Sequence, residues 1–197
     1  MSQKNRRRLV LAGGIAMTAL CIGACTTTGP SSGETAAGTA DRDRAIDAAV
    51  DATLQRLYVS VPGSRELVGK ARGVLVFPRV IAAGFWFGAQ YGEGALRVDG
   101  RTAGYYSTAG GSFGLQIGAQ SKALVYVFLT NDALAQFRQR DGWAVGTDAT
   151  VAVLKLGANG QLDTTTATNP VEVFVLTNAG LMAGVSLEGT KVSRLSP

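Results

Sequence analysis

The chain has 197 residues, of which 19 are basic and 14 acidic, so its formal net charge is +5. It contains no histidine, which excludes Ser-His-Asp and Cys-His catalysis and removes the commonest ligand of zinc. A chain of this length can form one domain with a substantial hydrophobic core.

The N-terminal segment is typical of a secretory signal peptide. Lys4 and three arginines, Arg6 to Arg8, precede an apolar run from Leu9 to Leu20. The run is shorter than the ~20 residues that a membrane-spanning helix needs. The arginines fit a twin-arginine export signal and a general export signal equally well.

Loss of this segment would change the charge of the protein. Residues 1–24 hold four of the 19 basic residues and none of the 14 acidic ones, which leaves 15 against 14 and a net charge of +1. Nucleic-acid binding needs a strongly basic face, so no nucleic-acid partner is expected.

The segment ends in Ile22-Gly23-Ala24-Cys25, which resembles the lipobox of bacterial lipoproteins. In lipoproteins the cysteine thiol receives a diacylglyceryl group and the chain is cut just before it. We therefore predict a signal peptide over 1–24 and a covalent lipid anchor on Cys25. Thr26 follows the cysteine, and by resemblance to enterobacterial sorting this favours the outer membrane, facing the periplasm. The alternative is an ordinary signal cut after Ala24, which would give a soluble periplasmic or secreted protein.

Residues 25–40 are predicted to be the lipidated cysteine and a flexible tether, because Thr, Ser, Gly, Ala and Pro predominate in them. Such a tether would span about 20 Å as a random coil. Residues 41–197 are predicted to be a single domain. Cys25 is the only cysteine left after cleavage, so no internal disulfide is expected.

The domain opens with two predicted helices. Asp41 to Tyr58 has an apolar stripe at helical spacing, and a second short helix runs from Ser64 to about Arg72, after the break at Pro62-Gly63. One interpretation is that both helices cover a sheet. The other is a helix lying on lipid, but the polar face of the first helix has as many acids as bases, which matches the basic faces of such helices poorly.

Strands follow, and two of them carry glycine on one face. Gly73 to Phe77 is a short apolar strand that ends at Pro78, and Phe85 to Tyr91 and Gly110 to Gln120 alternate apolar residues with glycines. Rows of glycine in strands mark a bend or a close approach. We consider two explanations, tight curvature of a barrel-like sheet (or a helix packed against it) and a shallow slot for a lipid.

The rest of the chain predicts more strands and one helix. Asn131-Asp132 can cap a helix that runs to about Gln139. The further strand candidates are Ala123–Leu129, Thr150–Leu156, Val171–Thr177, Leu181–Leu187 and Thr190–Arg194. Helices first and strands after them predict an α+β fold, with a mainly antiparallel, strongly curved, possibly barrel-like, glycine-rich sheet.

Five blocks in this order and spacing carry a family resemblance. They are Gly73–Pro78, Ala83–Phe85, Gly110–Ala119, Asn131-Asp132 and Leu181–Gly189. Together they resemble the SYLF domain, over about Ile46 to Arg194. The resemblance implies lipid binding. Eukaryotic members bind phosphoinositides, and some reach the actin machinery through an additional peptide-binding domain. Bacteria usually lack phosphoinositides, so phospholipid in general is the expected ligand here.

No catalytic set, metal site or cofactor site is predicted. Ser186 fails the Gly-x-Ser-x-Gly spacing, and the glycine-rich block at 110–114 lacks the Gly-Lys-Ser/Thr end of a phosphate loop. A phospholipid site needs cations beside apolar surface, with tryptophan favoured at the membrane interface. The candidates for it are Lys70, Arg72, Arg79 and Trp86.

The sequence therefore predicts a non-enzymatic, exported and membrane-anchored lipoprotein whose SYLF-like domain binds membrane phospholipid. The alternative is a structural or interaction protein of the bacterial envelope that contacts lipid only through its anchor. No protein partner can be named from the sequence.

Overall fold

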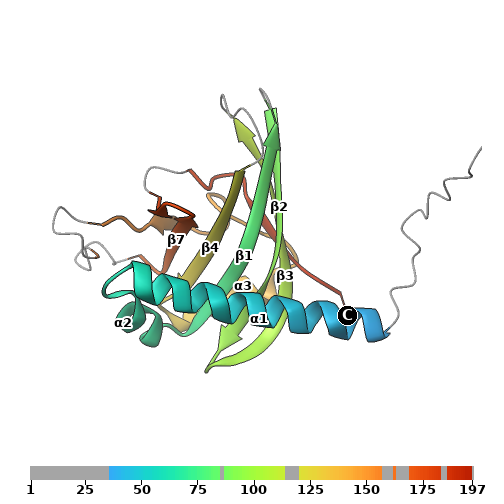
Figure 1. Ribbon diagram of the computed structural model, residues 1–197, viewed down its shortest axis with the longest axis horizontal. Helices are drawn as coiled ribbons and strands as arrows, with labels where there is room; N and C mark the ends of the chain where they lie inside the picture. The colour runs from blue at the N-terminus through green and yellow to red at the C-terminus, as the bar shows by residue number, and fades with distance from the viewer. Residues whose placement is uncertain are drawn as a thin grey trace, which may run out of the picture. The chain divides into compact units, whose positions relative to one another are not determined.

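The computed structural model describes residues 36–84, 87–113, 120–156, 162, 169–182 and 186–196. The chain divides into two units, 1–33 and 34–197, and all described residues lie in the second. Cys25 and the predicted signal peptide therefore lie outside the described residues. In the second unit two helices precede a curled sheet that forms a half-barrel (Figure 1). The predicted α+β class is confirmed.

The sheet has nine strands in the described part of the chain, in the order β5-β9-β3-β2-β1-β4-β7-β6, with β8 paired to β7. Every pairing is antiparallel except that of β6 with β7. The helices are α1 (Ala36–Ser60), α2 (Ser64–Gly69) and α3 (Asn131–Gln139). The strands are β1 (Gly73–Gly84), β2 (Phe87–Val98), β3 (Arg101–Phe113), β4 (Gln120–Phe128), β5 (Trp143–Ala144), β6 (Val151–Val153), β7 (Val171–Thr177), β8 (Gly180–Leu181) and β9 (Lys191–Arg194).

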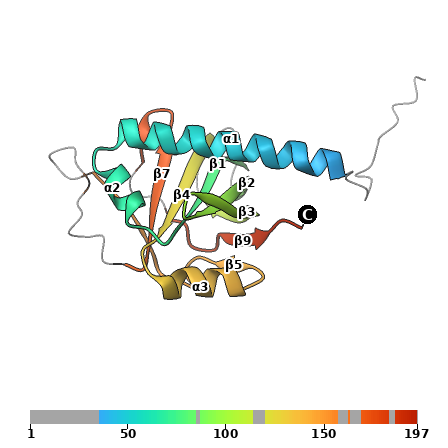
Figure 2. The same cartoon turned by 90° about the horizontal axis from the view of Figure 1, so that it is seen from below.

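Each face of the sheet has its own hydrophobic core. On the face that we call the α1 face, Val74, Val76 and Val125 pack with residues of α1 and α2. On the opposite face, the inner face of the half-barrel, Leu75 and Phe77 pack with residues of α3 and β5. Figure 2 shows α1 on one side of the sheet and α3 on the other. The predicted role of the N-terminal helices, to cover a sheet, is confirmed.

Strand β1 does not end at Pro78, and that prediction is wrong. The register with both neighbouring strands shifts around Pro78 and Arg79, as in a β-bulge. A bulge accommodates proline because the missing N–H is not needed there. The strand then continues to Gly84.

The glycines of β2 are explained by curvature. A Cβ on Gly94 would lie 2.0 Å from the carbonyl oxygen of Val76, and one on Gly92 would lie 2.6 Å from that of Arg79. Only glycine allows strands β1 and β2 to approach so closely. At these two positions the structure supports the curved-sheet interpretation of the glycine rows rather than a slot for a lipid.

Other elements are helices or strands as predicted, but their bounds or caps differ from the prediction. Helix α3 covers the predicted residues, but Thr130 caps it in place of Asn131-Asp132, since its hydroxyl accepts from the amide of Ala133 at 3.2 Å. Strand β3 begins nine residues before the predicted Gly110, and β8 is shorter than predicted. Among the described residues, no helix combines the length and the hydropathy needed to cross a membrane.

Candidate functional site

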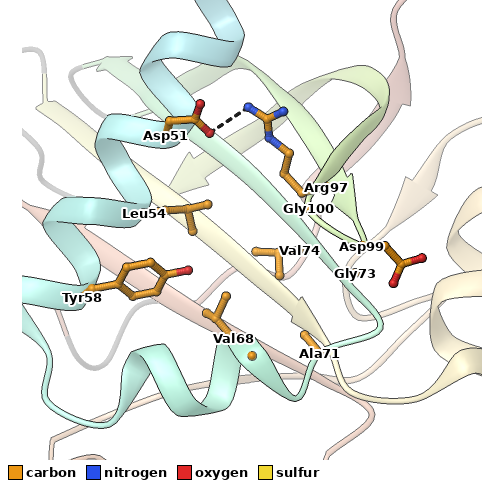
Figure 3. Close-up of a pocket in the computed structure, with 11 residues that line it drawn as sticks. Asp51, Leu54, Tyr58, Val68, Ala71, Gly73, Val74, Arg97, Asp99 and Gly100 are labelled. Carbon is orange, nitrogen blue, oxygen red and sulfur yellow. Dashed lines mark hydrogen bonds and ion pairs between the residues drawn. The ribbon is translucent and has the colours of Figure 1, made fainter.

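A cavity of about 340 Å³ lies where α1 and α2 meet the start of β1 and the turn between β2 and β3 (Figure 3). It lies on the α1 face of the sheet. Its lining residues come from four elements and the segments between them: Asp51, Leu54, Tyr58, Val68, Gly69, Ala71, Gly73, Val74, Arg97, Asp99 and Gly100.

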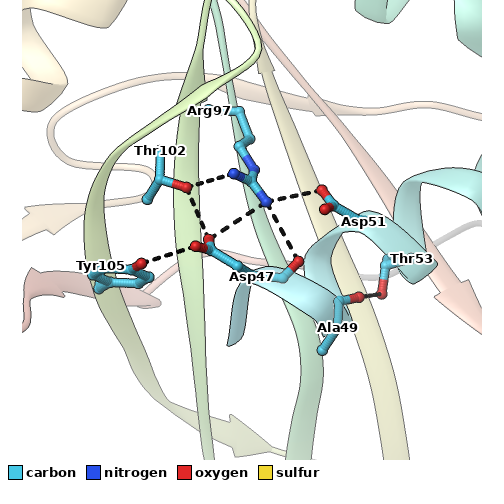
Figure 4. A network of polar contacts seen from close by, with 7 residues as sticks. All are labelled: Asp47, Ala49, Asp51, Thr53, Arg97, Thr102 and Tyr105. Carbon is cyan, nitrogen blue, oxygen red and sulfur yellow. Dashed lines mark hydrogen bonds and ion pairs between the residues drawn. The ribbon is translucent and has the colours of Figure 1, made fainter. Parts of the chain in front are cut away.

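The polar side of this pocket is built around Arg97 of β2 (Figure 4). The guanidinium donates to Asp51 of α1 at 2.8 Å and lies 3.4 Å from the carboxylate of Asp47. It also donates to the hydroxyl of Thr102. Only 15% of the Arg97 side chain is exposed, so its charge is balanced by two carboxylates rather than by solvent.

Asp47 connects helix α1 to strand β3 as well. One carboxylate oxygen accepts from the Thr102 hydroxyl at 2.8 Å, and the other accepts from the Tyr105 hydroxyl at 3.0 Å. Burial, followed by the hydrogen bond to Asp47, raises the pKa of Tyr105 to about 12. We call Asp47, Asp51, Arg97, Thr102 and Tyr105 the α1 latch. It fixes one wall of the pocket to the sheet.

The other walls of the pocket are largely apolar. Leu54, Val68 and Val74 contribute aliphatic side chains, and the ring of Tyr58 extends between them (Figure 3). The guanidinium of Arg65 stacks over that ring at 4.3 Å. Burial raises the pKa of Tyr58, an effect that the nearby Arg65 reduces. The pocket thus offers apolar surface next to charged groups.

The far side of the pocket is a hairpin turn. Asp99 and Gly100 have φ angles of 50° and 75°, and this conformation at both central positions is that of a type I′ turn. Asp-Gly is the sequence that such turns prefer, so the turn was predictable from Val98-Asp99-Gly100-Arg101. We did not predict a turn at these residues.

Two of the predicted lipid-binding residues are next to this pocket in the sequence but do not line it. Lys70 and Arg72 are both exposed and alternate along the chain with the lining residues Gly69, Ala71 and Gly73. Lys70 donates to Glu66 at 2.6 Å. Arg72 forms no side-chain hydrogen bond or ion pair within the described residues.

The other predicted residues do not join this pair. Arg79 lies at the bulge of β1, seven residues beyond Arg72, or about 20 Å along an extended strand. Trp86 and Cys25 lie outside the described residues. Within the described ranges, no group of three or more acidic or cysteine side chains could hold a metal ion.

Comparison with known proteins identifies the domain. A family model named Ysc84, described as "Las17-binding protein actin regulator", matches residues 109–196. The chain carries a Ysc84/SYLF-family domain. The resemblance inferred from the sequence blocks is therefore confirmed, and domains of this family are associated with lipid binding.

Curated relatives support the same family. The SH3 domain-containing YSC84-like protein 1 of Xenopus laevis is 32% identical over 132 residues, and its human and mouse counterparts are 31% and 30% identical over 129 residues. Each alignment covers 63% of this chain but only 37–38% of the relative. The chain thus spans less than two fifths of the length of these relatives, whose name also states an SH3 domain.

Proposed function

We propose that this SYLF domain binds membrane phospholipid at the pocket between α1, α2 and the β2–β3 turn. The observation that carries the proposal is a cavity with one apolar side, whose lining residues Gly69, Ala71 and Gly73 alternate along the chain with the exposed cations Lys70 and Arg72. A phospholipid needs apolar surface for its chain and cations for its phosphate. The association of the family with lipid binding supports the same ligand class.

The cations differ in how readily they can bind phosphate. Arg97 is held by Asp47 and Asp51, so its role is to fix α1 rather than to meet a ligand. Arg72 is unpaired in the described structure. Lys70 pairs with Glu66 across one exposed helical turn, and an exposed pair of this kind contributes little to stability. A phosphate could therefore displace Glu66 at small cost.

The proposal includes export and a lipid on Cys25. The basic head, the apolar run and the Ile-Gly-Ala-Cys sequence support it. Detergent-phase partitioning and intact mass of the protein from its native membrane test this part. Wild-type protein should partition with detergent and carry the added mass of acyl chains. Cys25→Ser should remain in the aqueous phase, and wild-type protein without added mass would contradict the lipoprotein assignment.

The binding part needs a protein without the anchor. Protein lacking residues 1–24 and carrying Cys25→Ser is sedimented with vesicles that contain anionic phospholipid, at low salt. Pelleting should weaken at least several-fold in Lys70→Gln/Arg72→Gln. Arg138→Gln is the matched control, because Arg138 is an exposed cation on α3, on the other side of the sheet.

Two outcomes would contradict binding at this pocket. Equal pelleting of both variants would place lipid contact elsewhere on the domain. No pelleting of any variant, while the acylated full chain stays on the membrane, would favour the alternative of an envelope interaction protein that contacts lipid only through its anchor.

A further inference from the structure

The pocket between α1, α2 and the β2–β3 turn is too small for both chains of a bilayer lipid. Its volume is about 340 Å³. A methylene group takes about the volume of one water molecule, roughly 30 Å³, so the pocket holds at most about eleven of them. Each chain of a bilayer lipid spans half of a hydrocarbon core ~30 Å thick, which takes about twelve methylene groups or more. The pocket therefore has room for one chain and not for two.

The walls of the pocket are held in place, which keeps its volume from growing to admit a second chain. The α1 latch ties one helix to the sheet. Helix α2 is held at its start, where the hydroxyl of the fully buried Ser64 donates to the carbonyl oxygen of Leu57 at 3.2 Å. After α2 the chain is bound to β4, since the amide of Arg72 donates to the carbonyl oxygen of Phe128 at 2.8 Å. Movement of either helix away from the sheet would break these contacts and open a close-packed core.

The charges around the pocket decide which end of a lipid enters it. Arg97 is the only cation among the lining residues, and Asp47 and Asp51 already balance its charge. A phosphate inside the pocket would therefore find no free cation and would meet the carboxylate of Asp51. The exposed cations Lys70 and Arg72 do not line the pocket but adjoin its lining in the chain. This arrangement favours a chain inside the pocket and a phosphate outside it.

We propose that the pocket binds the acyl chain of a lysophospholipid, a phospholipid that carries a single chain. The proposal rests on the proposed function and names the class of lipid. Leu54, Val68 and Val74 would contact the chain, and the ring of Tyr58, which extends between them, would lie along it (Figure 3). A lipid with two chains would leave about twelve methylene groups outside the pocket. A lysophospholipid has no second chain, so it binds as a monomer.

The test uses the limited depth of the pocket. Protein that lacks residues 1–24 and carries Cys25→Ser is titrated with monomeric lysophosphatidylglycerols whose chains lengthen from octanoyl to hexadecanoyl. Affinity should rise about fourfold with each methylene group that becomes buried. It should level off at about eleven carbons, where the pocket is full. The NMR signals of the Tyr58 ring, which lines the pocket, should shift saturably with each lipid.

Gly69→Leu should shorten the chain that fills the pocket. Gly69 lines the pocket, and no atom lies within 4 Å of a Cβ placed on it. The leucine side chain takes the room of about four methylene groups, so affinity should level off about four carbons earlier. Ala71→Leu, at a second lining residue, should act in the same direction. Gly111→Leu on β3 is the matched control, because its Cβ position is equally open and it does not line the pocket.

The outcomes separate this proposal from the function on which it rests. If no phospholipid binds, or if binding does not depend on Lys70 and Arg72, the proposed function itself is wrong. If phospholipid binds but affinity keeps rising up to the hexadecanoyl chain, or levels off at the wild-type length in both Gly69→Leu and Ala71→Leu, the single-chain proposal is overturned. Native mass spectrometry of the protein mixed with equal amounts of lysophosphatidylglycerol and phosphatidylglycerol should find the one-chain lipid bound. Equal retention of the two-chain lipid would also overturn the proposal.

Discussion

Replacement of Asp47 by asparagine should loosen helix α1 from the sheet. The carboxylate accepts from Thr102 and Tyr105 and faces Arg97 at 3.4 Å. Asparagine has one acceptor oxygen and no charge, so it loses one of the two hydrogen bonds and the attraction to Arg97. The partners left behind are only partly accessible to water, since 15% of the Arg97 side chain is exposed.

The magnitude follows from these contacts. A hydrogen bond to a charged group contributes about 1.5–3 kcal/mol, and solvent reaches the Asp47 side chain, which is 31% exposed. We therefore expect Asp47→Asn to lower the free energy of unfolding by about 2 kcal/mol. In a folded unit of this size, that corresponds to a fall in melting temperature of about 4–8 °C.

Thermal denaturation and the titration of Tyr105 measure the two consequences. The pKa of Tyr105, raised to about 12 in the wild type, should fall in Asp47→Asn but stay above 10, because burial, its main cause, remains. Asp51→Asn is the matched control. Its side chain is 67% exposed and has one partner, so its cost should be below about 1 kcal/mol. Equal losses of stability in the two variants, or an unchanged Tyr105 titration, would refute the latch.

Two further predictions concern the sheet. Gly94→Ala should lower the free energy of unfolding by about 3 kcal/mol or more, because the new methyl would lie 2.0 Å from the carbonyl oxygen of Val76. Gly111→Ala is the control, since no atom lies within 4 Å of its Cβ, and it should change stability by less than about 0.5 kcal/mol. Equal effects of the two variants in urea denaturation would contradict this account. Glu172→Gln should raise the melting temperature at neutral pH and leave it unchanged below the ordinary carboxyl pKa. Burial raises the pKa of Glu172, and hydrogen bonds from Asn169 offset this rise in part. The folded wild type therefore loses stability as pH rises from the carboxyl pKa of the unfolded chain through that of the folded protein. A difference in melting temperature between variant and wild type that does not grow with pH would be evidence against this account.

The order and kind of the elements were predictable from the sequence because they depend on local patterns. An apolar stripe at helical spacing predicts helix α1, and a continuous apolar run predicts the buried strand β4, whichever elements they pack against. The length of β1 was not predictable in the same way. Pro78 ordinarily ends a strand, and only the pairing with β2 and β4 on both sides produces the bulge that carries the chain past it.

The candidate site depends on contacts between distant residues, which no local pattern contains. Arg97 meets Asp47 and Asp51 across 50 and 46 residues of chain, and each of the three alone is an ordinary surface charge in the sequence. Lys70 and Arg72 were predicted because they lie beside an apolar strand, and they stay a prediction. Arg79 met the same criterion, but the extended β1 carries it away from them.

The proposed anchor determines which measurements can establish a role for the domain. If Cys25 carries acyl chains, two or more chains are enough for stable membrane attachment, and the domain need not bind lipid for the protein to stay on a membrane. Affinity of the pocket for phospholipid would then act on a second lipid or a second surface within reach of the anchor. Vesicle sedimentation without the anchor and detergent partitioning of the full chain therefore measure two separate properties, and the loss of one in a variant should leave the other intact.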